Sequence, residues 1–362
     1  MRIEPFKLEK WLLNTAEIDL GGGVVSQFKL KDVTRKFKYD ELLSYGDRRG
    51  SETLRREVAE WYRGVEPENI LITSGTSEAN LLVNLALLES GDDYVAEYPL
   101  YDQPPGFARS LGCQVKRFYL DEIRGWRPDL EQIKEAVTKK TKVIFFDNPN
   151  NPTGALLTEQ EMKAIVEIAE DVGAYVVCDN ALRGSEIDGR PGITPFEYYE
   201  KAVVTGSMSK LGMIGPRIGW VIASRQLLGE CWKFKDYTTL CHAGLSDYLA
   251  TIALKTENRT KYMKRNLRLS KAVLPLLTRW INENSSLVSW VPPKAGFTAF
   301  PKYSLSVKSE ELCKKALKEE NLLLSPGEHF GIENHFRINF GCETATMTEA
   351  LKRLTRLLNR LK

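Results

Sequence analysis

The sequence has few of the side chains that bind metals or form disulfides. It contains three histidines, His242, His329 and His335, which lie far apart, and six cysteines without a CxxC pair. This number and spacing argue against a protein-only metal site, a zinc cluster and a disulfide framework. Scattered thiols, and a first segment without the apolar region of a secretory signal, are typical of a cytosolic protein. We therefore expect a cytoplasmic location and no bound metal.

Long hydrophobic runs and a strong excess of one charge are lacking as well. No apolar run approaches the roughly 20 residues of a membrane-spanning helix, so we expect no membrane partner. The 51 Lys and Arg residues nearly balance the 48 Asp and Glu residues, which leaves a net charge of +3. Proteins that bind nucleic acids usually carry a larger basic excess, so we expect no nucleic-acid partner. The most basic stretch, residues 259–271, is interpreted as the solvated side of a helix.

What is present is the composition of a folded protein large enough for two lobes. The chain has 362 residues, of which 43% are hydrophobic and 27% charged. From about residue 50, short apolar segments alternate with helical patterns. The predicted strands cover residues 70–73, 93–97, 113–120, 142–147, 174–179, 202–207 and 218–223. This alternation indicates an α/β fold with a mainly parallel sheet and helices on both of its faces.

The pattern changes near residue 245. A helical stretch over residues 246–284 is expected to be interrupted by Pro275, and short strands and an amphipathic C-terminal helix follow it. The first 45 residues show no clear element pattern and are expected to pack on this second lobe. We therefore predict a large domain over residues 46–245 and a smaller α+β domain formed by residues 1–45 and 246–362.

Two polar motifs directly follow predicted strands. SGTSEAN (residues 74–80) opens a helix, where converging backbone N–H groups and the helix dipole favour an anion. DNPNNPTG (residues 147–154) places the side-chain amides of Asn150 and Asn151 at the C-terminal edge of the sheet, where α/β proteins bind ligands. The alternatives are an ordinary helix cap for the first motif and a plain strand-to-helix turn for the second.

Two charged residues also follow strands. Asp179 ends a buried strand, where a carboxylate is costly unless it is paired, so it is interpreted as the counter-ion of a buried cation or as a helix cap. Lys210 lies in the segment GSMSKLGMIGPRIGW and is interpreted as a desolvated, nucleophilic amine or as a surface lysine in a glycine-rich loop. The same segment supplies three side chains that can surround a phosphate, Ser207, Ser209 and Arg217.

Together these features match the needs of pyridoxal phosphate. This cofactor requires an amine for its aldehyde, an anion site for its phosphate and an acid that keeps its pyridine nitrogen protonated. Lys210 can supply the amine, and Asp179 can supply the acid. The anion site can be formed by residues 74–77 together with the serines and the arginine near Lys210.

With these motifs in this order, the chain resembles the class I and II aminotransferases, which have the aspartate-aminotransferase fold, fold type I of the pyridoxal-phosphate enzymes. The resemblance covers nearly the whole chain. It implies that Lys210 is the Schiff-base lysine, which also moves a proton between the substrate Cα and the cofactor C4′. It further implies that Asp179 pairs with the pyridine nitrogen, that Asn151 donates to the phenolic oxygen and that Tyr101 stacks on the ring.

The resemblance also implies a phosphate site, a substrate site and a dimer. The phosphate site would contain Gly75, Thr76, Ser77, Ser207, Ser209 and Arg217. Tyr45 would reach the phosphate of the other subunit, which implies a homodimer with composite active sites. The α-carboxylate of the substrate would be bound by Arg337, with Gly23 and Asn151 beside it.

Two positions depart from the family pattern. The family usually has a tyrosine three residues after the aspartate, and this chain has Leu182, so one hydrogen-bond donor to the phenolic oxygen is lost. Arg183 is a candidate to replace that donor. Arg217 follows Lys210 by seven residues, where eight is commoner, so the loop between them is one residue shorter.

The resemblance implies an aminotransferase that moves an amino group from an L-amino acid to a 2-oxo acid by a ping-pong mechanism. The first alternative is a lyase or a cyclase similar to capreomycidine synthase, which the leucine at 182 favours. The second is a domain that binds the cofactor for regulation or interaction, without turnover, which an intact set of Lys210, Asp179 and Arg337 argues against.

Overall fold

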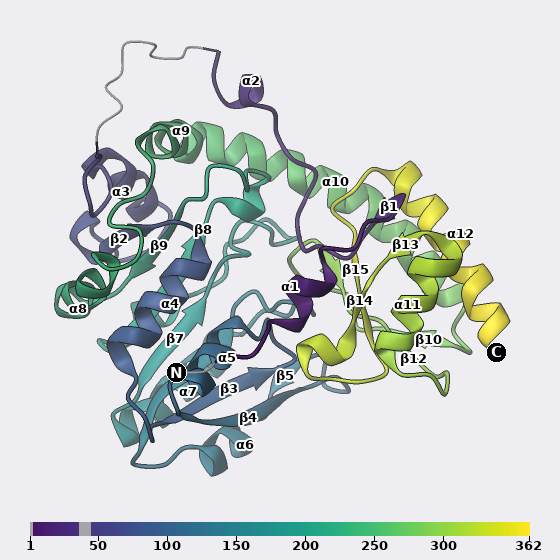
Figure 1. Cartoon of the computed structure of the whole chain (residues 1–362), viewed down its shortest axis with the longest axis horizontal. Helices are drawn as coiled ribbons and strands as arrows, with labels where there is room; N and C mark the ends of the chain where they lie inside the picture. The colour runs from purple at the N-terminus through teal and green to yellow at the C-terminus, as the bar shows by residue number, and fades with distance from the viewer. Residues whose placement is uncertain (1–2, 36–44) are drawn as a thin grey trace.

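A large mixed sheet forms the centre of the bigger lobe in the computed structural model, which describes residues 3–35 and 45–362 (Figure 1). Its eight strands are ordered β2-β9-β8-β7-β6-β3-β4-β5. Two strands are antiparallel to their neighbours, β9 and the short β5, and the others run parallel. The bounds are β2 (Ile70–Thr73), β3 (Asp93–Tyr98), β4 (Gln114–Asp121), β5 (Arg127–Pro128), β6 (Thr141–Asp147), β7 (Tyr175–Asp179), β8 (Ala202–Ser207) and β9 (Gly219–Ile222). The predicted α/β fold is confirmed.

Helices cover both faces of this sheet, which explains the unbroken apolar runs of its strands. In β6, Val143 and Phe145 pack with the helices on one face, and Ile144 and Phe146 pack with those on the other. Successive side chains of a strand point to opposite faces, so a strand between two helical layers is apolar throughout. The first layer contains α4 (Thr76–Leu87), α5 (Gln103–Ser110) and α8 (Arg225–Lys235). The second contains α3 (Glu52–Ala59), α6 (Leu130–Ala136), α7 (Glu159–Val172) and α9 (Gly244–Leu254).

The predicted helix break at Pro275 is wrong. The helical stretch divides instead at Lys255, which has extended backbone angles, and α10 (Thr256–Glu283) continues through Pro275. A proline inside a helix removes one backbone hydrogen bond. Here the loss is offset because Val273, Leu277 and Trp280 on the same helix are buried in the core of the small lobe.

The basic stretch of α10 is only partly the solvated face that its charge pattern predicts. Lys261, Lys264 and Arg268 are exposed, as expected. Arg259 is buried instead, because its guanidinium lies 5.0 Å from the centre of the Trp61 ring and donates to the carbonyl oxygens of Glu57 and Leu254.

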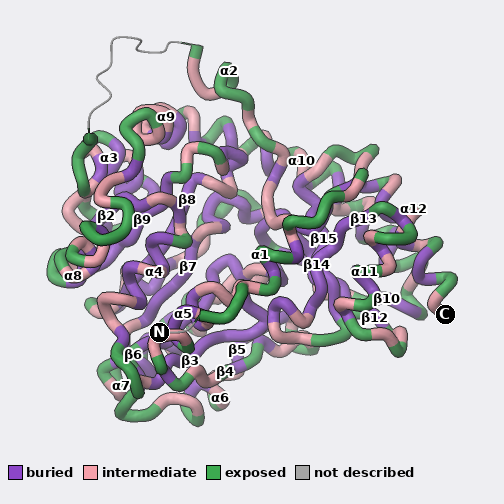
Figure 2. Tube along the Cα trace, in the orientation of Figure 1, coloured by how far each residue is buried: buried purple, intermediate pink, exposed green. Residues whose placement is uncertain are grey.

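The smaller lobe combines the end of the chain with its beginning. β1 pairs in parallel with β13, and the Trp11 indole N–H donates to the carbonyl oxygen of Leu324 across 2.7 Å. One core joins these segments with α10, α11 and α12, and Figure 2 shows buried backbone along this interior. The bounds are α1 (Lys7–Trp11), β1 (Ile18–Asp19), α2 (Leu30–Val33), β10 (Val288–Ser289), β11 (Thr298–Ala299), β12 (Lys302–Tyr303), α11 (Ser309–Glu320), β13 (Leu322–Leu323), β14 (Ser325–Pro326), β15 (Phe336–Asn339) and α12 (Thr344–Leu361). Four short 3-10 helices complete the elements, η1 (Pro67–Asn69), η2 (Pro195–Glu197), η3 (Ser209–Leu211) and η4 (Gly327–Phe330).

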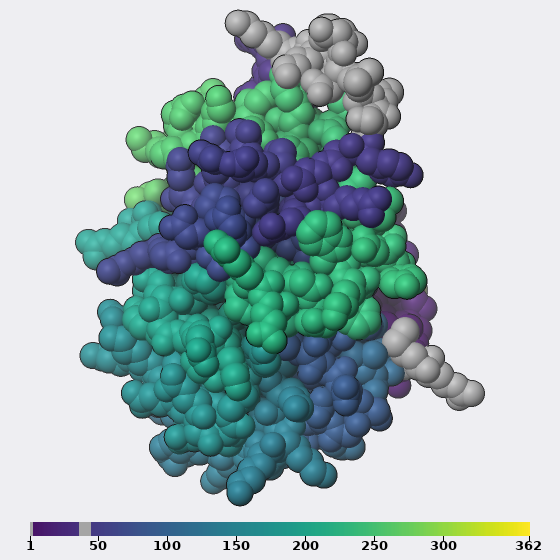
Figure 3. Space-filling view, turned by 90° about the vertical axis from the view of Figure 1, so that its left-hand side faces the viewer, coloured from purple at the N-terminus to yellow at the C-terminus, as the bar shows by residue number. Residues whose placement is uncertain are grey.

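On the face shown in Figure 3, the segment around α3 lies against the region of α8 and α9. Ser51, the N-cap of α3, donates from Oγ to Asp247 of α9 across 2.5 Å. The other oxygen of Asp247 lies 2.7 Å from Nε2 of His242. Asp247 therefore joins α3 to α9, and His242 supports its carboxylate. Within the described ranges, no helix combines the length and the apolar character needed to cross a membrane.

Candidate active site

A cavity of about 630 Å³ lies where the C-terminal ends of β6, β7 and β8 meet the small lobe and α1. This is the edge at which α/β sheets bind ligands. Most of the predicted site residues line it, and they come from both ends of the chain. They are Gly23, Thr76, Ser77, Tyr101, Asn151, Asp179, Ser207, Ser209, Lys210, Arg217 and Arg337. Gly75 lies directly beside the cavity, and Tyr45 is 77% exposed and is not part of the lining.

Lys210 projects into this cavity from η3, one turn after the end of β8. Its Nζ donates to the carbonyl oxygen of Gly23 across 2.7 Å. Burial, with a smaller contribution from the positive charge of Arg337, lowers the pKa of Lys210 to about 8, although the charge of Asp179 acts in the opposite direction. An amine with this pKa is neutral in about a tenth of the molecules at pH 7, far more often than an unperturbed lysine, and the neutral form is the nucleophile or base.

Asp179 ends β7 and is buried, with 9% of its surface exposed. Burial raises the pKa of this carboxyl, and hydrogen bonds oppose the rise. The side-chain amide of Asn80 donates to Oδ2 across 2.8 Å, and the backbone N–H of Ala181 donates to Oδ1 across 2.8 Å. Asn80 is itself oriented by Thr205, whose hydroxyl donates to Oδ1 of Asn80. These donors stabilise the charged form that could pair with a cation.

The N-terminus of α4 lies beside Arg217, an arrangement that could bind an anion. Gly75 caps α4 with φ +85°, and a Cβ at this position would overlap the guanidinium of Arg217. The close approach explains why glycine stands there. The hydroxyl of Thr76 is buried and has no hydrogen-bond partner in the part of the chain that the structure describes, so a donor is available in the cavity wall. Free backbone N–H groups at the start of a helix and a nearby arginine are a favourable setting for a phosphate.

Arg337 is fixed on β15 with 2% of its surface exposed. Its two terminal nitrogens donate to Oδ1 of Asn151 across 3.1 Å and to the carbonyl oxygen of Gly21 across 2.5 Å. Burial lowers the pKa of Arg337 to about 10. Its Nε is buried and has no partner among the described residues. This buried donor leaves a hydrogen bond that an anionic ligand could accept.

Several side chains at the cavity were not predicted, among them Asn80, Glu9 and Asp147. Asn80 is the last residue of the SGTSEAN motif and lies one helical turn after Thr76, so helical spacing could have placed it on the same face. Glu9 reaches the cavity from α1, where its carboxylate accepts a hydrogen bond from the Tyr101 hydroxyl across 2.8 Å. No pattern in the sequence links Glu9 to residues so far along the chain.

The suggestion that Arg183 replaces the missing tyrosine donor is wrong. Its guanidinium donates to the carbonyl oxygens of Trp61 and Gly192 and lies 4.3 Å from the centre of the Tyr62 ring, away from the cavity lining. Leu182 does line the cavity, so that part of the wall is apolar.

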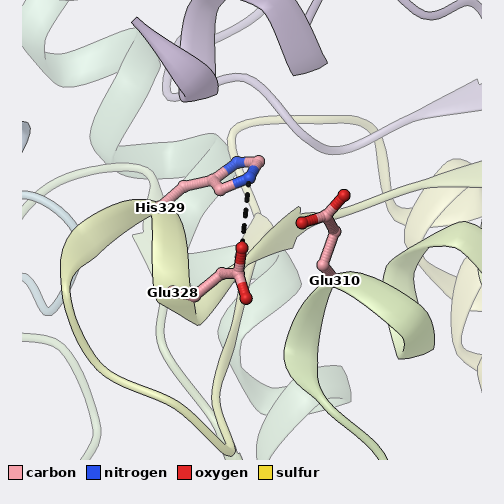
Figure 4. A group of neighbouring side chains, drawn as sticks. All are labelled: Glu310, Glu328 and His329. Carbon is pink, nitrogen blue, oxygen red and sulfur yellow. Dashed lines mark ion pairs between the residues drawn. The ribbon is translucent and has the colours of Figure 1, made fainter. Parts of the chain in front are cut away.

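A second polar cluster, made of Glu310, Glu328 and His329, lies outside the cavity (Figure 4). Its ligand-type atoms lie within 4.8 Å of one another, and Nε2 of His329 is 4.0 Å from a carboxylate oxygen of Glu328. Burial lowers the pKa of His329 to about 4, and burial together with the neighbouring glutamates raises the pKa of Glu328 to about 7. Figure 4 shows the two glutamates on different elements, α11 and η4.

The cavity residues fit pyridoxal phosphate. The unpartnered hydroxyl of Thr76, the helix N-terminus and Arg217 suit its phosphate, and the lowered pKa of Lys210 suits the attachment of its aldehyde. The buried carboxylate of Asp179 suits the protonated pyridine nitrogen.

Sequence comparison relates almost the entire chain to enzymes of one family. Residues 15–354 match the family described as aminotransferase class I and II. Capreomycidine synthase of Streptomyces vinaceus is 26% identical over 303 residues, covering 83% of this chain and 77% of that protein. An aspartate aminotransferase of Pyrococcus horikoshii is also 26% identical, over 339 residues that cover 91% of this chain and 86% of that protein.

Solved structures agree in fold over the full length. A PLP-dependent aminotransferase from Streptococcus suis 89-1591 has a TM-score of 0.93 at 33% identity, covering 100% of this chain and 99% of that chain. The PLP-dependent cyclase OrfR has a TM-score of 0.90 at 28% identity, covering 99% of this chain and 98% of that chain. The chain therefore belongs to the class I and II aminotransferase family, whose members have fold type I and use pyridoxal phosphate as cofactor.

Proposed function

We propose that this protein is an aminotransferase that moves the amino group of an L-amino acid to a 2-oxo acid in the cavity around Lys210. One observation carries the proposal. Gly23 lies between Lys210 and Arg337, because its carbonyl oxygen accepts from Lys210 Nζ and a Cβ on it would be 3.5 Å from Nη1 of Arg337. An amino acid whose carboxylate is bound by Arg337 would therefore have its Cα within reach of the lysine amine.

The proposed roles follow from these positions. Arg337 binds the α-carboxylate, and its planar guanidinium allows two parallel hydrogen bonds. Lys210 attaches the cofactor at rest and moves the proton from the substrate Cα during turnover. Bound pyridoxal phosphate supplies the electron sink that makes this Cα–H bond acidic, and Asp179 holds the proton on its pyridine nitrogen. Asn151, Tyr101 and the residues of the phosphate site orient the ring.

A lyase or a cyclase is the second candidate function. Leu182 favours it, because the cavity lacks the hydroxyl that the family usually places at this position. The similarity to capreomycidine synthase and to the cyclase OrfR also supports it. Such enzymes use the same lysine and aspartate and differ in where the electrons go after the α-proton leaves.

A half-reaction without a 2-oxo acid separates the two candidates. An aminotransferase will convert a competent amino acid to one 2-oxo acid per site, bleach the cofactor absorption band and stop. Adding a 2-oxo acid will then restore the band. Continuous release of ammonia without an acceptor would contradict the aminotransferase and identify a lyase.

The attachment site is tested by reduction with borohydride followed by peptide mapping. We expect the reduced cofactor on Lys210, and we expect Lys210→Ala to lose both the attachment and nearly all turnover. A reduced cofactor on another lysine would overturn the assignment.

We further propose the assembly and the division of the chain that the sequence predicts. Tyr45 would complete the phosphate site of a second subunit, which its high exposure in a single chain allows. The large domain would cover residues 46–245. Pairing of β1 with β13 supports the grouping of residues 1–45 with residues 246–362.

A further inference from the structure

One wall of the cavity is formed by the N-terminal segment, which is distant in sequence from the proposed cofactor-binding residues. Phe6, Leu8, Glu9 and Leu12 line it, and Figure 1 shows α1 between the large sheet and the small lobe. Phe6 packs edge-on against Tyr101, with ring centres 4.9 Å apart. This wall is apolar apart from a single carboxylate.

The charges in the cavity leave that carboxylate without an assigned role. Of the residues that the structure describes, the cations that line it are Lys210, Arg217 and Arg337, and the proposed function uses each of them for the cofactor or the α-carboxylate. Among the acids, Asp179 belongs to the pyridine nitrogen. Asp147 is buried, and burial together with the charges of Asp179 and Glu97 raises its pKa well above the usual range, which disfavours its charged form. Glu9 therefore remains as the unassigned charge.

The surroundings of Glu9 hold it at the cavity and leave it without a counter-ion. Tyr101 donates to Oε1, and burial and the charge of Glu9 raise the pKa of the Tyr101 hydroxyl well above its usual range, so that hydroxyl stays a donor. Among the described residues, no Lys, Arg or His nitrogen lies within 4.0 Å of the Glu9 carboxylate. Its negative charge also acts on Lys210 and Arg337, which places it in the electrostatic environment of the reacting groups.

We propose that Glu9 selects the substrate, and that its carboxylate binds a cationic group, an amine or a guanidinium, at the end of the amino acid's side chain. This inference rests on the proposed function for the position of the α-carboxylate on Arg337. The side-chain carboxylate of a dicarboxylic amino acid would meet the like charge of Glu9, and each described cation lining the cavity has another role. Phe6, Leu8 and Leu12 would contact the methylene groups between the two charged ends.

Equilibrium binding tests the proposal without turnover. We would use carboxylic acids that lack the α-amino group and so cannot react, and measure their affinity for the cofactor-loaded protein by calorimetry. The set is 5-guanidinopentanoate, its neutral isostere 5-ureidopentanoate, and the dicarboxylate hexanedioate. We expect the guanidino acid to bind most tightly and hexanedioate most weakly.

Two variants assign the preference to one side chain. Glu9→Gln keeps a hydrogen-bond acceptor for Tyr101 and removes the charge, and we expect it to reduce the preference for the guanidino acid over the ureido acid by about tenfold, as for a charged hydrogen bond partly screened by water. Glu4→Gln is the matched control, because Glu4 is an exposed glutamate of the same segment outside this cavity's lining. It should retain the full preference.

Different outcomes would contradict the role of Glu9 and the aminotransferase activity. Equal binding of the cationic and neutral ligands to the wild-type protein, or an unchanged preference in Glu9→Gln, would overturn the role of Glu9 whatever reaction the enzyme performs. Ammonia release in the half-reaction would overturn the aminotransferase and leave the ligand preference standing. A panel of amino donors should show the same order, with lysine, ornithine or arginine used better than aspartate or glutamate.

Discussion

Asn80 donates a hydrogen bond from its side-chain amide to Oδ2 of Asp179 across 2.8 Å. The bond connects α4, whose N-terminus is the proposed phosphate site, to β7, which ends in the proposed acidic partner of the cofactor ring. Because the Thr205 hydroxyl donates to the other end of the amide, the NH2 group can only face Asp179. Asn80 is therefore a positioning residue that holds the aspartate in place and stabilises its charge.

Removing this donor should change how activity depends on pH. Burial raises the pKa of Asp179 and the Asn80 bond lowers it, so Asn80→Ala should raise it further. The acidic limb of the kcat/KM profile should then move to higher pH, by about one pH unit for the loss of one hydrogen bond to a charged group. The control is Asn84→Ala, one turn later on α4, because the Asn84 side chain donates to the carbonyl oxygen of Pro104. An acidic limb that stays in place in Asn80→Ala would contradict the role.

The charge of Asp179 itself should matter more than its shape. Asp179→Asn keeps a side chain of the same size and removes the negative charge opposite the pyridine nitrogen. We expect turnover to fall by several orders of magnitude, with circular dichroism unchanged. Activity near that of the wild type would show that the residue only caps the segment that follows β7.

Lys210 should make the cofactor-free protein more stable as the pH rises. Its pKa is about 8 in the folded chain, below the value of about 10.5 for an unperturbed lysine. Below pH 8 both states hold the proton and the folded state bears the full cost of the buried charge. Between about pH 8 and 10.5 only the unfolded state holds it, so the free energy of unfolding increases with pH.

Lys210→Met removes this titration and serves as the comparison. Denaturant unfolding of both cofactor-free proteins should show the variant more stable at pH 7, with a difference that shrinks as the pH approaches 10.5. A difference that is constant between pH 7 and 10 would show that burial does not shift the pKa of this amine.

Position 182 should control the titration of the bound cofactor. Leu182→Tyr supplies a hydroxyl that can donate to the phenolic oxygen, and Leu182→Phe adds the same ring without it. A hydrogen bond to the charged form of a group lowers its pKa. The absorption of the bound cofactor should therefore titrate at lower pH in the tyrosine variant than in the phenylalanine variant. Identical titrations would indicate that the new hydroxyl does not reach the ring.

Much of this fold could be predicted from the sequence, because its strands are buried on both faces and read as short apolar runs. Lys210 and Asp179 were also predictable, since each follows such a run and the ends of parallel strands meet at one edge. The orientation of Arg183 was not predictable, because it depends on the carbonyl oxygen of Trp61 far along the chain. Glu9 lies in the cavity only because α1 packs against Tyr101 and the small lobe, a tertiary contact without a local signal.

Tyr45 should act across a dimer interface. It is 77% exposed and does not line the cavity of its own chain. Since a two-fold dimer repeats every contact, a hydroxyl donated to the partner's phosphate site implies two composite sites. Tyr45→Phe should weaken the binding of pyridoxal phosphate to the cofactor-free protein, whereas Tyr237→Phe, which also changes an exposed tyrosine, should not. Sedimentation should show the active enzyme as a dimer, and a fully active monomer would refute the assignment.

Mixed dimers give the sharpest test of this role. Lys210→Ala and Tyr45→Ala subunits should each have low activity alone. In a heterodimer with composite sites, one site carries both defects and the other carries neither, so mixing the two proteins should regain activity. If Tyr45 instead served the site of its own chain, every site in the mixture would keep a defect and activity would stay low. Regained activity would also show that Lys210 and the Tyr45 that completes its site belong to different subunits.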